Sequence, residues 1–384
     1  CPAAGSPSSI PSFSQDRYDL HMSWVEHAIW WHIYPLGLCG APIREPDTAP
    51  GPRLRRLLGW LDYAVELGCS GLLLGPIFAS QSHGYDSLDL FRIDPRLGDE
   101  ADFAELVSQC RERGLRILLD GVFSHVGSEH PDVRHALTQG PGSPAGKLFD
   151  IDWQHPGGPR PRVFEGHSSL VRLNHSGQEA VDLAVRVMNH WLDRGIDGWR
   201  LDAAYSVRPE FWSKVVERVR PRHPNAWLLG EVLHGDYSAF VAESGIDSVT
   251  QYELWKAAWS SLLDGNFFEL DWCLKRHNEL LDRFVPATFV GNHDVTRIAS
   301  KVGAGGAALA VVLLMTVGGV PSVYYGDEQA FRGVKTETLG GDDEVSRGEV
   351  VGGDPSGPMP VGGVPGFAEH GGSPSVDGVA RFLG

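Results

Sequence analysis

Four carboxylates stand at or just after the ends of apolar runs, where they could act in nucleophilic or acid–base chemistry. Asp120 follows RILL, Asp202 follows GWRL, Glu231 follows WLLG, and Asp294 comes just after FVGN. Each of them alone could be a helix N-cap or a surface charge. Four at equivalent positions are hard to assign to capping alone, because chemistry in a parallel barrel takes place at the carboxyl ends of the strands. The spacing therefore predicts a shared acidic site.

Two of these carboxylates have surroundings that predict different roles. Arg200 and Asp202 are two residues apart on one predicted strand, so both side chains point to the same face, inside the barrel. A guanidinium there would hold the Asp202 carboxylate ionised, as a nucleophile requires. Glu231 follows apolar WLLG, with no basic residue before His234, and desolvation of this kind raises a pKa toward that of a general acid. Two carboxyl groups whose pKa values are separated in this way are typical of glycoside hydrolysis.

The elements that must position these groups alternate along the chain. Amphipathic segments with helical periodicity, such as residues 101–114, 180–195 and 267–284, separate short apolar runs. The eight runs cover residues 29–36, 71–77, 116–122, 196–202, 226–231, 246–251, 287–292 and 321–326. Alternating strands and helices predict an α/β protein with a parallel sheet, and eight strands match a closed (β/α)8 TIM barrel.

One connection and the two chain ends depart from this alternation. Residues 126–174, rich in Gly, Pro and His, are too long for an ordinary loop, so they predict a small inserted domain after the third strand, over the active site. The barrel then divides into residues 22–125 and 175–339. Residues 1–21 predict an extension outside the core, with Met22 as the natural start. Residues 340–384 hold 13 glycines and 5 prolines and predict a tail of low order.

Composition excludes several classes of function. The 384-residue chain is 42% hydrophobic and 21% charged, which is typical of a globular protein. Its net charge of −16 would repel a phosphate backbone, so nucleic acid is not expected as a partner. No apolar run reaches the length of a membrane span, no secretory signal precedes Met22, and the five cysteines form no metal or disulfide pattern. We therefore expect a cytoplasmic protein with reduced core thiols and no membrane partner.

Short motifs between Trp24 and Lys335 resemble those of the α-amylase family of glycoside hydrolases (family 13). In order they are GLLLGPI, HGYDSLDLFRIDPRLG, DGVFSH, GWRLDAA, GEVLH, FVGNHD and GGVPSVYYGDE. Each motif is weak alone, but seven in this order are specific. The resemblance implies that Asp202 is the nucleophile and Glu231 the acid/base, while Asp294 binds sugar hydroxyls and helps to distort the ring. It also implies substrate contacts from Tyr85, His125, Arg200 and His293.

Departures from the family pattern bear on metal binding and specificity. Members that hold a calcium ion below the inserted domain usually carry Asn where this chain has Ser124, a poorer ligand for a hard cation, so we expect no cofactor and calcium is not favoured. Tyr205 and Ser206 stand where starch-cutting amylases often have Lys-His, which implies that the leaving group is held differently. The segments LVRLN and GEVLH resemble the neopullulanase and cyclomaltodextrinase branch, whose members favour short or cyclic maltooligosaccharides.

The reaction implied by the resemblance is the retaining hydrolysis of α-glucosidic bonds in maltooligosaccharides or related α-glucans by double displacement. The carboxyl groups of Asp202 and Glu231 should then lie about 5 to 5.5 Å apart. Alternatives stay open: a transglycosylase, an α-glucosidase on a disaccharide such as sucrose or trehalose, or a non-catalytic carbohydrate-binding barrel. A barrel that binds Mg²⁺ through its carboxylates is disfavoured by Arg200, whose positive charge beside Asp202 would oppose a cation.

The resemblance also implies elements that the sequence does not supply. Family barrels close with an eighth helix and continue into an all-β carboxyl-terminal domain, whereas the residues beyond Lys335 show no helical period and no run of strands. Our hypothesis is that the reading frame is altered or truncated near Glu344 to Gly348. We then expect the outer faces of the first and eighth strands to form an exposed apolar patch that favours aggregation or weak activity.

Overall fold

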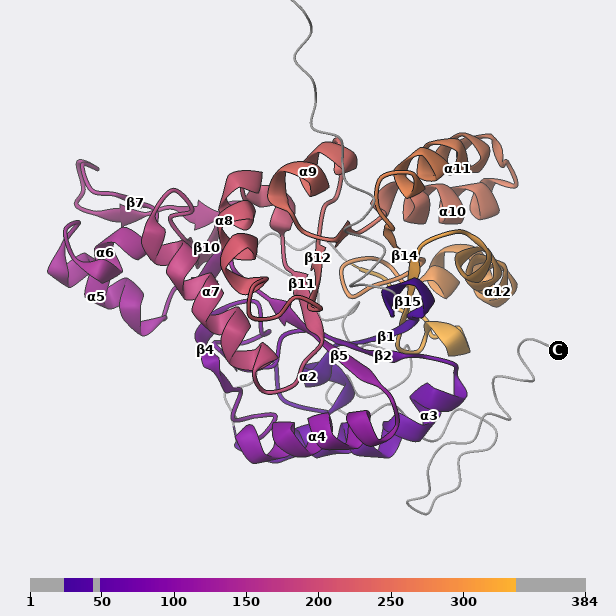
Figure 1. The fold of residues 1–384 in the computed structure, drawn as a ribbon, viewed down its shortest axis with the longest axis horizontal. Helices are drawn as coiled ribbons and strands as arrows, with labels where there is room; N and C mark the ends of the chain where they lie inside the picture. Colours follow the sequence, from indigo (N-terminus) through magenta and orange to yellow (C-terminus); the bar gives the residue numbers. More distant parts are fainter. Residues whose placement is uncertain (1–23, 44–48, 336–384) are drawn as a thin grey trace, which may run out of the picture.

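The computed structural model describes residues 24–43 and 49–335, and its centre is an eight-stranded parallel sheet (Figure 1). The strands are β1 (Trp30–Ile33), β2 (Gly71–Leu74), β5 (Arg116–Gly121), β11 (Gly198–Leu201), β12 (Trp227–Gly230), β13 (Ser248–Val249), β14 (Ala287–Phe289) and β15 (Val320–Tyr324). Their order is β13-β12-β11-β5-β2-β1-β15-β14, and a parallel bridge between Thr250 and Ala287 joins the two ends of that order. Each predicted apolar run overlaps one strand, so the expected (β/α)8 barrel is confirmed.

Side chains that alternate along the strands contribute to two separate cores. On β1, Trp31 belongs to the large core that the helices cover, whereas Trp30 belongs to a smaller cluster built from the inward positions of several strands. Trp30 stacks on Trp227 of β12, with ring centroids 5.9 Å apart and planes 5° apart. A Cβ on Gly71 of β2 would approach the Trp30 ring to 2.5 Å, so this position requires glycine. Two stacked tryptophans and aliphatic side chains thus fill this part of the barrel interior.

Helices surround the barrel (Figure 1). Among the described residues outside 125–172, the α-helices are α2 (Pro35–Leu38), α3 (Leu61–Glu66), α4 (Glu100–Glu112), α7 (Gln178–Leu192), α8 (Pro209–Val219), α9 (Tyr237–Ser244), α10 (Tyr252–Asp264), α11 (Phe268–Leu281) and α12 (Ile298–Thr316). Short 3-10 segments are η2 (Val25–His27), η3 (Arg53–Trp60), η4 (Ala204–Ser206) and η5 (Asp327–Gln329). Local signals fix the helix starts: a capping box of Asp99 and Asp102 begins α4, and Pro209 begins α8.

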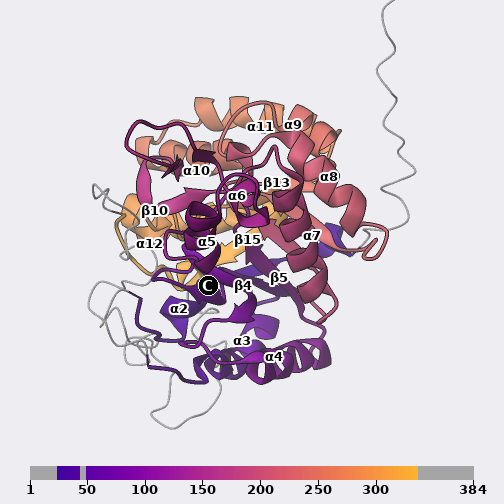
Figure 2. The ribbon, with the colours of Figure 1, turned by 90° about the vertical axis from the view of Figure 1, so that its left-hand side faces the viewer.

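A separate small lobe follows the third barrel strand. It contains β6 (His125–Gly127), α5 (Pro131–Gln139), α6 (Pro144–Leu148), β7 (Ile151–Asp152), β8 (Arg160–Pro161), β9 (Val163–Phe164) and β10 (His167–Arg172). Strands β6, β10 and β9 form an antiparallel sheet, and a hairpin of β3 (Phe78–Ser80) and β4 (Ser87–Ile93) lies after β2. Seen from the side, α5 and α6 lie in front of the barrel (Figure 2). We call the lobe from His125 to Arg172 the inserted segment.

The outer faces of the first and eighth barrel strands are buried, so the expectation of an exposed patch there is wrong. Trp31 of β1 packs against Trp60 and Tyr63, and Val323 of β15 packs in a cluster with Ala307 of α12. Helix α3, which follows β1, and helix α12, which precedes β15, therefore cover the outer faces of these strands. Exposed apolar side chains occur instead on the outside of α12, at Leu309, Val312 and Met315.

Helix α12 is also, among the described residues, the one helix whose length and composition would suffice to cross a membrane. Its Ala307, Ala310 and Leu314 pack against Val290 and Val323 at the barrel, which is the position of a barrel helix. Four cysteines, Cys39, Cys69, Cys110 and Cys273, are free and buried, as expected. The predicted extension at residues 1–21, the tail at residues 340–384 and the proposed frame change lie outside the described residues.

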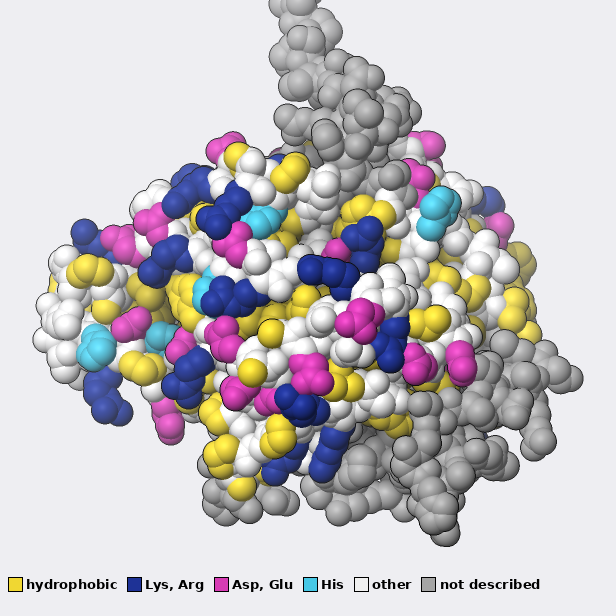
Figure 3. All heavy atoms as spheres, turned by 60° about the horizontal axis from the view of Figure 1, so that its bottom comes forward, with side chains coloured by type: hydrophobic (Ala, Val, Ile, Leu, Met, Phe, Trp, Pro, Cys, Tyr) yellow, Lys and Arg dark blue, Asp and Glu magenta, His cyan; other side chains and the backbone are white. Residues whose placement is uncertain are grey.

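Charges of both signs share the surface. On the face shown in Figure 3, lysine and arginine side chains are interspersed with aspartate and glutamate. With a net charge of −16, this face offers no continuous basic strip that could follow a phosphate backbone.

Candidate active site

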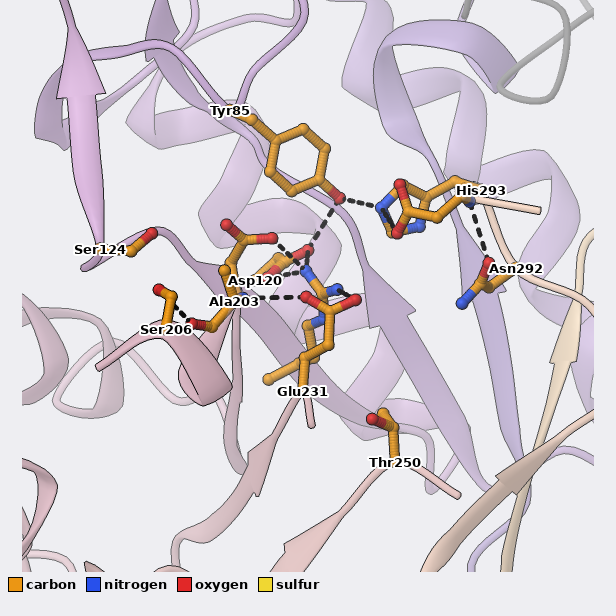
Figure 4. A network of polar contacts seen from close by, with 12 residues as sticks. Tyr85, Asp120, Ser124, Ala203, Ser206, Glu231, Thr250, Asn292 and His293 are labelled. Atoms are coloured by element: carbon orange, nitrogen blue, oxygen red, sulfur yellow. Dashed lines mark hydrogen bonds and ion pairs between the residues drawn. The ribbon is translucent and has the colours of Figure 1, made fainter. Parts of the chain in front are cut away.

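One buried guanidinium joins three of the four carboxylates that the sequence placed at strand ends (Figure 4). Arg200 is 4% exposed, and its Nη1 donates to both carboxylate oxygens of Asp120, at 2.8 and 2.7 Å. The same nitrogen donates to Asp202 Oδ1 at 2.9 Å, and Nη2 pairs with Glu231 Oε1 at 2.7 Å. A single positive charge thus holds three buried carboxylates around one point.

The register of three neighbouring strands brings these side chains together. Strand β11 lies between β5 and β12, and Arg200 is directly opposite Asp120 in the ladder. Just beyond the strands, Asp202 N donates to Gly121 O at 3.0 Å and Glu231 N donates to Leu201 O at 2.9 Å. The ladder therefore fixes the backbone of both residues at the carboxyl edge of the barrel, where barrel enzymes place their chemistry.

The remaining predicted residues meet the same cluster. Tyr85 O–H donates to Asp120 Oδ2 at 3.0 Å and lies 2.5 Å from His293 Nε2, with the two rings stacked. The His293 Nε2 is also 3.0 Å from Asp294 Oδ2, and His125 Nε2 is 3.0 Å from Tyr85 O. All seven residues singled out from the sequence therefore lie in one connected site.

Burial works against the ionised form of the acidic groups. Burial raises the pKa of Asp202, Arg200 lowers it, and the neighbouring charge of Glu231 raises it further, so the net shift is upward. For Asp120, burial likewise outweighs Arg200 and raises the pKa to about 6. One guanidinium cannot neutralise three buried carboxylates, so the site favours retaining a proton.

This arrangement corrects the expectation drawn from the Arg200–Asp202 spacing. The sequence predicted that Arg200 contacts Asp202 and that no basic group contacts Glu231. In the structure, the Arg200 guanidinium contacts Asp120 and Asp202, as well as Glu231. The reason is geometric: neighbouring parallel strands bring side chains as close as residues on a single strand. Spacing along one strand could not reveal these cross-strand contacts.

Sequence reasoning missed Tyr252, which contacts Glu231, and Asn292, which contacts Tyr252. Tyr252, the first residue of α10, donates its O–H to Glu231 Oε1 at 3.0 Å, and Asn292 Nδ2 donates to the Tyr252 oxygen at 2.9 Å. The other carboxylate oxygen, Oε2, accepts from Ala203 N at 2.8 Å. Both missed residues adjoin quoted sequence runs, Tyr252 after IDSVTQ and Asn292 within FVGNHD. Their positions just past strand ends were the available signal.

A cleft of about 710 Å³ opens over this cluster. Its floor includes Asp202, Glu231 and Asp294. One wall comes from the inserted segment, through Phe164, Glu165, His167 and Leu170, and the opposite wall comes from α10 and α11, through residues such as Trp255 and Trp272. Such a cleft, with carboxyl groups on the floor and aromatic rings on the walls, has the size and lining of a small-molecule site.

Clusters of metal-ligating side chains bear on whether the site could hold a cation. In residues 24–43 and 49–335, no group of three or more His, Cys, Asp or Glu side chains could hold a metal ion. Ser124 stands where calcium-binding family members usually carry Asn. Its hydroxyl is 2.8 Å from His125 Nδ1. This contact places the Ser124 hydroxyl in the hydrogen-bond network of the site.

Comparisons with known proteins identify relatives over most of the chain. The family model described as "Alpha amylase, catalytic domain" matches residues 54–163 and 161–361. A cyclomaltodextrinase of Geobacillus thermopakistaniensis is 31% identical over 350 residues, which cover 83% of this chain and 58% of the relative. The intracellular maltogenic amylase of Bacillus subtilis (strain 168) is 33% identical over 227 residues, 55% of this chain and 39% of the relative.

A solved structure shares the fold closely. The cyclic alpha-maltosyl-(1→6)-maltose hydrolase from Arthrobacter globiformis, in complex with cyclic alpha-maltosyl-(1→6)-maltose, superposes with a TM-score of 0.76 at 25% identity, and the match covers 94% of this chain and 83% of that one. The chain spans less than two thirds of the length of the first two relatives above. The family match reaches residue 361, beyond Glu328, where the last quoted sequence motif ends.

Proposed function

Because the chain belongs to the α-amylase family of glycoside hydrolases, we propose that it hydrolyses α-glucosidic bonds in maltooligosaccharides or related α-glucans and retains the anomeric configuration. The observation that carries this proposal is the pairing of Asp202 and Glu231 with one guanidinium, which places two carboxyl groups on the floor of one cleft. The cyclomaltodextrinase relative agrees with the branch that the motifs resemble.

The first half of the proposed reaction forms a covalent intermediate. Asp202 attacks the anomeric carbon while Glu231 gives its proton to the glycosidic oxygen, so the leaving sugar departs as an alcohol and an ester joins the glycosyl unit to Asp202. Arg200 contacts both carboxyl groups and the Ala203 N–H donates to Glu231, so together they keep the two groups oriented toward the same bond. Asp294, with His293 beside it, binds hydroxyls of the sugar.

The second half regenerates the enzyme. Glu231, now ionised, takes a proton from water, and the resulting nucleophile opens the ester on the face that the leaving group vacated. Two inversions restore the original configuration. Transfer to a second sugar would follow the same route with a sugar hydroxyl in place of water, so this activity is a second outcome of the same site.

Product analysis tests this proposal. The protein is incubated with linear maltooligosaccharides, cyclodextrin, pullulan, sucrose and trehalose, and the first-formed anomer is followed by NMR. We expect α product from the maltooligosaccharides and cyclodextrin. A β anomer would contradict retention, and turnover of sucrose or trehalose alone would replace the proposed substrate class with disaccharides.

We also propose that the protein acts inside the cell without a metal cofactor. One relative is named as an intracellular maltogenic amylase. The Ser124 hydroxyl contacts His125, and no group of three or more described His, Cys, Asp or Glu side chains could hold a metal ion. Immunodetection after cell fractionation tests the location, and its recovery in the secreted fraction would contradict it.

A further inference from the structure

The wall of the cleft formed by α10 and α11 is joined directly to the proposed proton donor. Tyr252 begins α10 and donates to Glu231 Oε1, and Trp255 lies against Tyr252 with ring centroids 5.9 Å apart. Trp255 and Trp272 of α11 both line the cleft. In Figure 1, α10 and α11 lie side by side at the end of the molecule away from α5 and α6. The wall therefore extends from Glu231 outward.

Trp272 presents a supported aromatic ring on this wall. Its side chain is 58% exposed, although it lines the cleft. Arg276, one turn further along α11, places its guanidinium carbon 4.6 Å from the ring centroid. The guanidinium is itself fixed, because its Nη2 pairs with Glu253 Oε1 at 3.0 Å and Oε2 at 2.9 Å. Because this guanidinium is fixed on one side of the Trp272 ring, it restricts the motion of the Trp272 side chain before any ligand binds.

A second exposed ring lies near Trp272 on α11, outside the residues that line the cleft. Phe268 precedes Trp272 by four residues on α11, so the two side chains lie on the same face of the helix, and Phe268 is 83% exposed. Exposed aromatic rings beside a cleft indicate a binding surface rather than core packing. No described residue covers Phe268 enough to account for its ring as core.

Polar groups border the aromatic surface. Lys256 on α10 pairs with Glu269 Oε1, and Ser260 Oγ donates to Glu269 Oε2 at 2.9 Å. Glu253, Lys256 and Glu269 all line the cleft. A glucose ring has apolar C–H faces and a rim of hydroxyls, so it matches a surface in which aromatic rings lie beside charged hydrogen-bonding groups.

We propose that Trp272 and Phe268 form a stacking surface for glucose units on the leaving-group side of the scissile bond. This inference rests on the proposed function, because the assignment of the side follows from Glu231: the acid protonates the leaving oxygen, and the wall that holds Glu231 receives the sugar that departs. The surface favours substrates with several units beyond the cut over short ones. It is a specificity-determining element outside the catalytic cluster.

The test compares chain-length preference in matched variants. The ratio of kcat/KM for maltoheptaose to that for maltotriose is measured in the wild type, Trp272→Ala, Trp272→Phe and Leu309→Ala. We expect the ratio to fall about tenfold in Trp272→Ala, equivalent to about 1.4 kcal/mol, mainly through KM. Trp272→Phe keeps a ring and should recover most of the ratio. Leu309 is equally exposed, at 58%, but lies on α12 outside the cleft, so its variant should keep the wild-type ratio.

The outcomes separate this inference from the proposed function. If the wild type hydrolyses both sugars and Trp272→Ala keeps its ratio, the stacking surface is refuted while the function stands. If the wild type hydrolyses neither sugar, the proposed function is refuted. Calorimetric titration with maltoheptaose then tests the stacking surface by itself. Trp272→Ala should bind maltoheptaose about tenfold more weakly than the wild type, and equal affinities would overturn the inference.

Discussion

The two ends of the same barrel strands differ in almost every physical respect. Toward the amino ends, Trp30 and Trp227 stack inside the barrel in an apolar cluster. At the carboxyl ends, Arg200 holds Asp120, Asp202 and Glu231 in a buried network. Apolar filling stabilises the fold, whereas clustered charges cost desolvation free energy that only a function would justify. A few residues along one strand thus separate the stabilising end from the reactive end.

The largest expected effect comes from changing the reactive end alone. Asp202→Asn removes the nucleophile and Glu231→Gln the proton donor, so each should lower kcat by several orders of magnitude, about 10³-fold or more. The free energy of unfolding should hardly change, because each amide keeps the shape of the carboxyl group that it replaces. Steady-state kinetics and urea denaturation check this pair.

The exposed Asp264 at the end of α10 supplies the control for these variants. Asp264→Asn should leave both kcat and stability at wild-type values. Normal turnover in Asp202→Asn or Glu231→Gln would show that the two roles have been assigned to the wrong residues.

A change at the stabilising end should have the opposite profile. Trp227→Ala removes a 2%-exposed ring that stacks on Trp30, and large-to-small changes of this kind cost about 3–5 kcal/mol of unfolding free energy. Under conditions where the variant is folded, kcat should fall far less than in Asp202→Asn. Denaturant titration measures the loss, with Leu309→Ala as the exposed control. A loss below 1 kcal/mol would mean that the interior rings contribute little.

The pH dependence of the free energy of unfolding should show how much a buried carboxyl group at the reactive end destabilises the fold. The pKa of Asp120 is raised from 3.8 to about 6, so the folded state binds more protons than the unfolded state between these values. Stability therefore falls as pH rises from 4 to 6, by about 2 kcal/mol from this group. Urea denaturation across this range should show a shallower fall in Asp120→Asn. Equal slopes in the two proteins would contradict the assignment.

The smallest expected effect is that of metal removal. The Ser124 hydroxyl contacts His125, and no described cluster of acidic or histidine side chains fits a cation. Treatment with a chelator should change kcat and the melting temperature by less than the error of measurement. A loss of activity that added calcium restores would place a calcium site in this protein and overturn the expectation.

Sequence patterns predicted the strands more completely than the contacts within the site. Apolar runs marked all eight strands, because strands buried on both faces are continuous in composition. Motifs supplied Asp202, Glu231 and Asp294, but the sharing of Arg200 depends on the register between β5, β11 and β12, which no local pattern encodes. Tyr252 was missed for the same reason, since its contact with Glu231 joins two separate strand ends. The supported ring of Trp272 emerged only from the packing of α11.

The covalent intermediate provides the most direct test of the central claim, which is that Asp202 and Glu231 work as nucleophile and acid/base around Arg200. The protein is incubated with a fluorinated α-glucosyl fluoride that forms a slowly hydrolysed glycosyl-enzyme, digested, and mapped by mass spectrometry. We predict one added glycosyl unit on the peptide that contains Asp202, in the wild type and not in Asp202→Asn. An adduct on Glu231 or Asp294, or rapid turnover of natural substrate with inversion and no adduct, would contradict the account.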